Sequence, residues 1–193
     1  MAISNNTTGL RTGVCTSTTR PTAPYEGQMI YTTDLDTLEL WNGTAWRIMG
    51  AATATSGSIL QVVGGVTTTQ VTSSSTTPVD TTLTATITPK STSSKILVIV
   101  HQEGLLKLDG NTDITLNLFR SSTLLLTIGT QIGVTGTTTL NGVGGAGTSY
   151  MDSPATTSAV TYKTQFFSRA NIATAAVQHA GATSTITLME IAG

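Results

Sequence analysis

The chain is short of charge, cysteine, histidine and aromatic side chains. Of its 193 residues, 10% are charged, 5% are aromatic, one is a cysteine and two are histidines. Nine basic and ten acidic residues give a net charge of −1, so no basic patch could follow a phosphate backbone. These shortages argue against nucleic-acid binding and leave few groups able to move protons or hold a metal ion.

Sequence features of secreted and membrane proteins are also missing. Cys15 has no second cysteine with which to form an internal disulfide. Residues 1–13 lack a basic segment followed by an apolar core, so they do not form a secretory signal. The longest apolar run, Ile96–Val100, is far shorter than the ~20 residues that span a membrane. We therefore expect no membrane insertion.

Threonine is the most abundant residue and fills 43 positions. Its β-branched side chain packs well on a pleated surface, and its hydroxyl hydrates a sheet face without adding charge. This composition is typical of a β-sheet scaffold, and we expect no enzymatic activity. A nearly neutral surface also lacks the charge repulsion that keeps monomers apart, which favours self-association.

The few candidate chemical motifs lack the partners that their chemistry needs. Neither His101 nor His179 has another histidine or a cysteine within four residues, which argues against a metal site. Asp34 and Asp36 lie in a turn without the closing glutamate of a calcium loop. Gly142–Gly147 matches G-x-G-x-x-G, but no helix-forming segment follows, so a loop is expected. We expect no cofactor, no metal and no catalytic residues.

A change in amino-acid composition near residue 57 predicts two domains, residues 1–57 and residues 58–193. Both tryptophans lie in the first domain, and Gly50–Gly57 is a small-residue linker with nothing to bury. Residues 1–20 are polar and irregular. We expect this segment to become ordered only where it lies along another structure.

Three strands are predicted in the first domain: Gln28–Thr32, Leu38–Trp41 and Ala45–Met49. Asn42-Gly43 is a strong hairpin signal because both residues tolerate positive φ. A meander of about thirty residues is marginal in water on its own, so its apolar side chains need a partner surface. That surface is either the second domain, or two further copies of the meander or a larger assembly. The side chains are Tyr25, Met29, Tyr31, Leu38, Leu40, Trp41, Trp46 and Ile48.

The second domain is predicted to consist of short strands throughout, separated by turn residues. Such spacing is typical of a β-sandwich or jelly roll. Ile96–Val100 is apolar on both faces, which places it centrally in a sheet and covered on both sides. Ala170–Ala180 fits helix or strand, and we expect strand. The predicted strands are Ile59–Val63, Thr67–Thr72, Leu83–Thr88, Lys95–Gln102, Ile114–Arg120, Leu124–Ile128, Gly133–Leu140, Tyr162–Phe167, Ala175–His179 and Ser184–Ile191.

Alternation predicts which side chains of three strands face the core. Apolar and polar residues alternate in Leu83–Ile87 and in Ile114–Phe119, so each strand is expected to have one buried face and one solvent-exposed face. Ser184–Ile191 is moderately apolar on both faces, so we expect one face to meet the sandwich core and the other a neighbouring subunit. The residues of this strand assigned to trimer packing are Leu188, Met189 and Ile191.

One string in the first domain resembles a known family. Arg20-Pro-Thr-Ala-Pro-Tyr-Glu-Gly-Gln-Met-Ile-Tyr-Thr-Thr-Asp34, followed by Leu38-Glu-Leu-Trp-Asn-Gly-Thr-Ala-Trp46, resembles a segment of many tailed-bacteriophage virion structural and fibre proteins. The likeness covers residues 20–49. In such proteins the segment is an attachment or trimer-collar element, which implies that residues 1–50 dock on the particle.

The second domain resembles a C-terminal module of phage appendage proteins, especially those of marine and cyanobacterial phages. The matching strings are Ile59–Val63, Thr88–Val98, Leu116–Arg120, Met151–Lys163 and Ser184–Ile191. The last two resemble trimeric C1q/TNF-like jelly rolls, which end on a strand near the threefold axis. Because the chain has no long repetitive shaft, a head fibre, decoration knob or short tail appendage fits better than a long tail fibre.

These observations together predict an all-β homotrimer on a virion surface. An N-terminal extended segment and three-stranded meander would attach to capsid or tail proteins, and a jelly-roll knob would contact a host-surface saccharide. The alternative is a capsid decoration protein that stabilises the shell without host binding. The loop residues expected to face a receptor are Asn141, Gly144, Gly147, Ser153 and Thr156.

Overall fold

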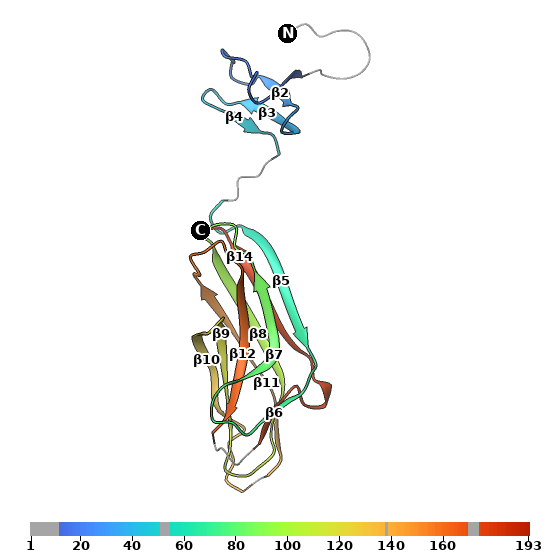
Figure 1. Cartoon of the computed structure of the whole chain (residues 1–193), viewed down its shortest axis with the longest axis vertical. Coiled ribbons are helices and arrows are strands. Elements are labelled where there is room, and N and C mark those ends of the chain that lie inside the picture. Colours follow the sequence, from blue (N-terminus) through green and yellow to red (C-terminus); the bar gives the residue numbers. More distant parts are fainter. Residues whose placement is uncertain (1–11, 51–54, 138, 170–173) are drawn as a thin grey trace. The chain divides into compact units, whose positions relative to one another are not determined.

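The computed structural model describes residues 12–50, 55–137, 139–169 and 174–193. The chain divides into two compact units, Met1–Thr53 and Ala54–Gly193 (Figure 1). Within the described ranges every regular element is a strand except one short 3-10 turn, η1 (His179–Gly181), so the fold is all-β. None of the helical structure in these ranges is long and apolar enough to cross a membrane.

Unit 1 is built on one sheet of four strands. In sheet order these are β1 (Gly13–Cys15), β2 (Met29–Thr32), β3 (Thr37–Trp41) and β4 (Trp46–Ile48). The Asn42 side chain closes the β3–β4 hairpin, because its Oδ1 accepts hydrogen bonds from the backbone N–H groups of Thr44 and Ala45 at 3.1 and 2.8 Å. Gly43 takes the positive φ that the hairpin requires.

The strand β1 adds to the three strands predicted from the sequence. It pairs in parallel with β2, with Gly13 opposite Ile30 and Cys15 opposite Thr32. The described part of the polar N-terminal segment is therefore ordered by lying along β2. Residues 1–11, and residues 51–54 of the predicted linker, lie outside the described ranges.

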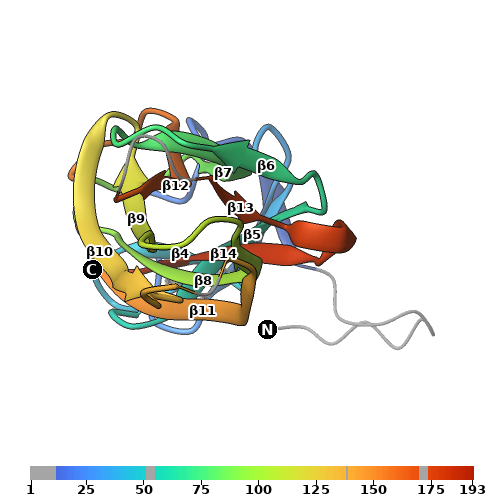
Figure 2. The same ribbon diagram turned by 90° about the horizontal axis from the view of Figure 1, so that it is seen from below.

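Unit 2 is a sandwich of two antiparallel sheets (Figure 2). The smaller sheet has the order β10 (Thr123–Ile132), β9 (Ile114–Arg120), β12 (Val160–Ser168) and β7 (Val79–Ile87). The larger sheet has the order β5 (Ile59–Thr67), β14 (Ser184–Ile191), β8 (Lys95–Lys107), β13 (Ala175–Val177) and β6 (Val71–Ser73), and β11 (Asn141–Asp152) pairs with the other edge of β8.

Alternating side chains from both sheets fill the space between them. Leu83 and Ile87 of β7 pack with Val98 of β8 and Leu188 of β14 in one buried cluster. From Leu83 to Ile87 of β7, buried and exposed residues alternate strictly, which confirms the predicted alternation. In β9, residues 114, 116 and 118 are likewise fully buried.

A group of buried polar side chains also lies between the two sheets. Thr81 and Thr164 hydroxyls lie 2.5 Å apart, and Thr164 donates to the Gln102 carbonyl oxygen at 2.8 Å. The Gln102 amide and the Glu103 backbone N–H both donate to the Ser184 hydroxyl, at 3.0 and 2.9 Å. This network joins β7 and β12 of the smaller sheet to β8 and β14 of the larger one, and it satisfies groups that would be costly to bury alone.

Three strand predictions need correction. The described residues of Gly133–Leu140 form turns and irregular structure, because Gly133 turns the chain at positive φ after β10. Thr67–Thr72 is not one strand, since residues 68–70 separate β5 from β6. Ile96–Val100 is central in its sheet as predicted, but Ile99 is 38% exposed, so this chain covers only one of its faces.

The predicted strand near the C-terminus is shorter than expected. Ala175–His179 was predicted, whereas β13 ends at Val177 because Gln178 takes a left-handed conformation and η1 follows. Of the segment Ala170–Ala180, residues 170–173 lie outside the described ranges.

Candidate functional site

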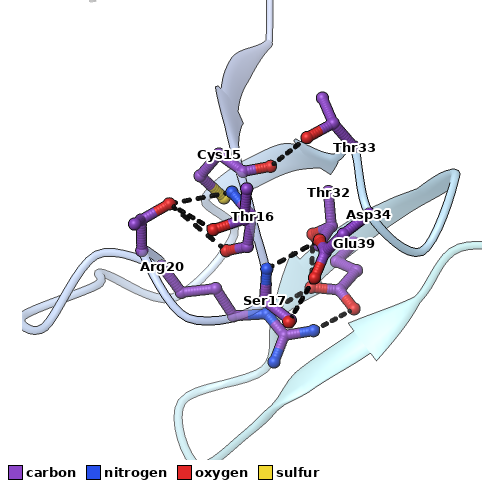
Figure 3. A network of polar contacts seen from close by, with 9 residues as sticks. Cys15, Thr16, Ser17, Arg20, Thr32, Thr33, Asp34 and Glu39 are labelled. Atoms are coloured by element: carbon purple, nitrogen blue, oxygen red, sulfur yellow. Dashed lines mark hydrogen bonds and ion pairs between the residues drawn. The ribbon is translucent and has the colours of Figure 1, made fainter.

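An ion pair holds the segment before β2 against the sheet of unit 1 (Figure 3). Arg20 donates through Nε and Nη2 to the two carboxylate oxygens of Glu39, at 2.8 and 2.7 Å. The Thr32 hydroxyl donates to the same carboxylate at 2.9 Å, and Glu39 is 2% exposed. These contacts compensate a buried charge. The first residue of the phage-like string is thus a structural partner of β3.

A second set of hydrogen bonds fixes β1 and the turn that follows it (Figure 3). The backbone N–H of Ser17 donates to Asp34 Oδ1 at 2.8 Å, and its hydroxyl donates to Oδ2. The backbone N–H of Thr33 donates to the Cys15 carbonyl at 2.9 Å. The hydrogen bonds from Ser17 hold the pKa of Asp34 below its ordinary value. The aspartate of this turn therefore orders the N-terminal segment.

One face of this sheet presents large apolar side chains to the outside. Cross-strand register places Val14, Tyr31 and Leu38 in one row, and Met29 and Leu40 in the next. Val14 is 69% exposed, and the other four are partly exposed. Four of these five residues were predicted as attachment residues. Val14 was missed because β1 was not predicted.

The other predicted attachment residues lie elsewhere in unit 1. Trp41 and Trp46 are cross-strand partners with ring centroids 5.5 Å apart, on the face that carries Glu39. Ile48 pairs with Glu39 and is exposed, and Tyr25 is exposed in the segment before β2. The predicted residues are therefore divided between two faces of the sheet and do not form a single surface.

The larger sheet of unit 2 carries a row of apolar side chains on its outward face. Register places Val62, Met189, Leu97 and Met151 in one row across β5, β14, β8 and β11. Ile99 lies at the centre of the next row. Contiguous exposed apolar side chains of this kind are typical of contact surfaces between proteins.

The three β14 residues assigned to trimer packing do not share this face. Met189 and Ile191 point outward and are partly exposed. Leu188 is completely buried between the sheets, so the prediction that it contacts a neighbouring subunit is wrong. The period of two in a strand turns Leu188 and Ile186 inward together.

β14 also carries a buried carboxylate, Glu190. Its Oε2 accepts a hydrogen bond from the Gln61 amide at 2.6 Å, and its Oε1 accepts one from the Lys90 backbone N–H at 2.6 Å. Burial alone would raise the pKa of Glu190. Hydrogen bonds from the Gln61 amide and the Lys90 backbone N–H, together with the charge of Lys90, outweigh burial and lower it. Glu190 thus ties the end of β14 to β5 and to the turn after β7.

The residues predicted to face a receptor fall in two different parts of unit 2. Asn141, Gly144 and Gly147 belong to β11, so the prediction that they form a loop is wrong. Ser153 and Thr156 lie in the irregular segment between β11 and β12, where the Thr156 hydroxyl accepts a hydrogen bond from the Ser158 backbone N–H at 3.0 Å.

The glycines of β11 make room for a hydrogen-bonded pair of side chains on the adjacent strand. His101 Nε2 and Glu103 Oε1 lie 2.6 Å apart. A Cβ atom at Gly145 would lie 2.7 Å from the Glu103 carboxylate, and one at Gly147 would lie 2.8 Å from the Val100 carbonyl oxygen. The G-x-G-x-x-G string therefore serves strand packing. In the part of the chain that the structure describes, no three His, Cys, Asp or Glu side chains lie close enough to hold a metal ion.

A polar cluster on the outward face of the smaller sheet was not predicted from the sequence. Asp80 Oδ1 accepts a hydrogen bond from Gln165 Nε2 at 2.7 Å and lies 2.8 Å from Lys163 Nζ. Burial alone would raise the pKa of Asp80, but these two donors outweigh burial and lower it. The cluster joins β7 to β12. The sequence shows charged residues within two threonine-rich strands. It does not show that these two strands are neighbours in the sheet.

Comparisons with known proteins give little further information. No protein-family model and no curated protein sequence matches the chain. Among solved structures, the infectious bursal disease virus VP2 subviral particle aligns with 90% of this chain, at 12% identity and a TM-score of 0.35. The alignment covers 45% of the VP2 chain, so this chain spans less than half its length. An alignment with this TM-score does not establish a common fold.

Proposed function

We propose that this chain is a subunit of a homotrimeric virion appendage, attached to capsid or tail proteins through residues 1–50 and exposing residues 58–193 toward the host surface. The observation that carries the proposal is the apolar sheet face of unit 1, formed by Val14, Met29, Tyr31, Leu38 and Leu40. Among the described residues of unit 1, Ile30 is the one fully buried hydrophobic side chain. A unit with so small a core needs a partner surface for stability.

Two further observations support assembly on a particle. The string from Arg20 to Trp46 resembles the attachment segment of phage structural proteins. Unit 2 adds the outward apolar face around Met189 and Ile99, which suits contact between copies. Three copies closed around an axis would bury such faces and protect exposed sheet edges.

The test is to propagate virions that encode this chain and to count its copies per particle by quantitative mass spectrometry. A handful to a few dozen copies supports an appendage. Hundreds of copies would support the alternative, a capsid decoration protein that stabilises the shell. Absence of the chain from purified particles would overturn both.

A matched pair of variants tests the attachment face. Leu40→Asp places a charge on that face and is expected to remove the chain from purified virions. Leu35→Asp places the same charge on an exposed turn residue and is expected to leave incorporation unchanged. Tryptophan fluorescence of each purified variant shows whether unit 1 still folds. Normal incorporation of a folded Leu40→Asp chain would contradict attachment through this face.

A further inference from the structure

We propose that the outward face of the smaller sheet of unit 2 is a saccharide-binding site centred on Asp80, Lys163, Gln165 and Asn117. The inference rests on the proposed role of unit 2 in host contact. It assigns binding to residues on strands, whereas the sequence predicted binding by loops.

Strand register brings the central residues together. Asp80 of β7, Gln165 of β12 and Asn117 of β9 are direct cross-strand neighbours in one row. Neighbouring strands lie about 4.8 Å apart, so Asp80 and Asn117 are about 10 Å apart, roughly the length of two sugar rings. Lys163 lies one outward position further along β12. The row can therefore contact a short oligosaccharide.

The polar groups suit a ligand with several hydroxyls. The Asp80 carboxylate is an acceptor with capacity beyond its bonds to Lys163 and Gln165, and its side chain is 56% exposed. Lys163 and Gln165 supply donors immediately beside it. Each sugar hydroxyl both donates and accepts, so adjacent hydroxyls can bind the carboxylate and the neighbouring donors together.

Asn117 supplies an independent indication of a ligand. Leu116 and Leu118 point into the core, so Asn117 between them faces the outward side. It is only 5% exposed, and its Oδ1 has no hydrogen-bond partner in the described part of the protein. An unpaired buried oxygen is costly and uncommon in folded proteins. This oxygen is covered by its neighbours, so a ligand hydroxyl would donate to it only after those side chains move aside.

The backbone beside Asp80 is distorted, and a hollow lies next to it. The β7–β12 register shifts between Asp80 and Thr84, and Thr82 within this bulge has a φ of 70°. Positive φ is strained for a β-branched residue, and such strain and bulges concentrate at functional sites. A hollow of about 130 Å³ lies here, lined by Asp80, Thr82, Thr84 and Lys163 among others.

Two phenyl rings flank the polar residues on the same face. Phe119 is the cross-strand partner of Lys163, and Phe167 lies two residues beyond Gln165 on β12. Both rings are partly exposed. A binding site that combines a few polar groups with aromatic surface suits a sugar ring, whose C–H faces are apolar and whose edges are polar.

The test uses the full-length chain on a printed array of bacterial lipopolysaccharide and capsular oligosaccharides, followed by calorimetric titration of the strongest binder. Asp80→Asn and Lys163→Met are each expected to weaken binding at least tenfold. Lys95→Met, which removes an exposed lysine from the larger sheet, is the matched control and is expected to bind as the unaltered chain does. Circular dichroism checks the fold of each variant.

The outcomes separate this site from the proposed function. Binding that survives both Asp80→Asn and Lys163→Met, or that falls equally in Lys95→Met, would overturn the site. If the chain is found on virions but no oligosaccharide on the array binds, the site is overturned and the appendage proposal stands. Binding that depends on Asp80 in a chain absent from virions would overturn the appendage proposal and support the site.

Discussion

At the scale of single residues, several carboxylates of this chain are buried with dedicated partners that join separate strands. Besides Glu39 and Glu190, Asp152 accepts hydrogen bonds from Arg120 Nη1 at 3.0 and 2.8 Å and from the Tyr162 hydroxyl at 2.7 Å. Burial and the bond to Asp152 raise the pKa of Tyr162 far above its ordinary value. Each of these carboxylates depends on its partners, so removing one partner has a measurable cost.

Arg20→Met is expected to destabilise unit 1 by about 2–3 kcal/mol, because Glu39 would remain buried without its partner. Both tryptophans belong to unit 1, so tryptophan fluorescence during urea unfolding reports on this unit alone. The double variant with Glu39→Leu is expected to recover much of the loss. Arg47→Met, at an exposed position of β4, is the control. An equal loss in this control would contradict a specific role for the ion pair.

Glu190 is expected to make unit 2 sensitive to acid. Its pKa in the folded chain lies below the ordinary value of 4.5, so its stabilisation is fully present above that pH and is lost as the pH falls toward the lowered value. Glu190→Gln should lower the free energy of unfolding by about 1–2 kcal/mol at pH 7 and by progressively less at lower pH. Urea unfolding followed by circular dichroism between pH 2.5 and 7 measures this. A pH-independent difference would argue against the linkage.

At the scale of elements, the strand β5 depends on a glycine that lets two sheets approach. A Cβ atom at Gly65 would lie 2.1 Å from the Thr84 carbonyl oxygen of β7 and 2.9 Å from an Ile186 methyl group. Gly65→Ala is therefore expected to destabilise unit 2 by about 2–3 kcal/mol in urea unfolding. The adjacent Gly64 has its nearest contact at 3.8 Å, so Gly64→Ala is expected to be neutral. Similar behaviour of both variants would contradict the close approach.

The same glycines show what sequence patterns could and could not predict. Alternation in β7 and β9 identified their buried faces, because one side of each strand must cover the core, whereas β14 is apolar on both faces and its buried face was not identified. Gly64-Gly65 and the glycines from Gly142 to Gly147 looked like strand ends or loops. In the fold they lie within β5 and β11, and at Gly65, Gly145 and Gly147 the neighbouring backbone or side chains leave no room for a Cβ atom. Such tertiary contacts leave no local signal.

Candidate sites were less predictable than strands, because they depend on which strands become neighbours. The apolar residues of β2 and β3 were identified from composition alone, but their division between two faces followed from register. Asp80 and Lys163 are 83 residues apart and meet only through the β7–β12 pairing. No rule of residue spacing along the sequence predicts that these two side chains meet.

At the scale of the whole molecule, each unit leaves one apolar sheet face outside its own core. In unit 1 this face carries Val14 and Leu40, and in unit 2 it carries Met189 and Ile99. With a net charge of −1, little repulsion opposes contact between copies. The proposed trimer therefore needs no complementary charges at its interface. A single charge introduced on such a face should be enough to prevent trimer formation.

Met189→Asp is expected to convert a trimer into monomer or aggregate, because it places an uncompensated carboxylate in the middle of the proposed contact between copies. Multi-angle light scattering would then show a fall from three chain masses to one mass of 19.9 kDa, or heterogeneous larger species. Val134→Asp adds the same charge at an exposed residue after β10 and should leave the trimer intact. An unaltered chain that is already monomeric would remove the basis of the trimer. A Met189→Asp trimer of unchanged mass would show that the copies meet through a different surface.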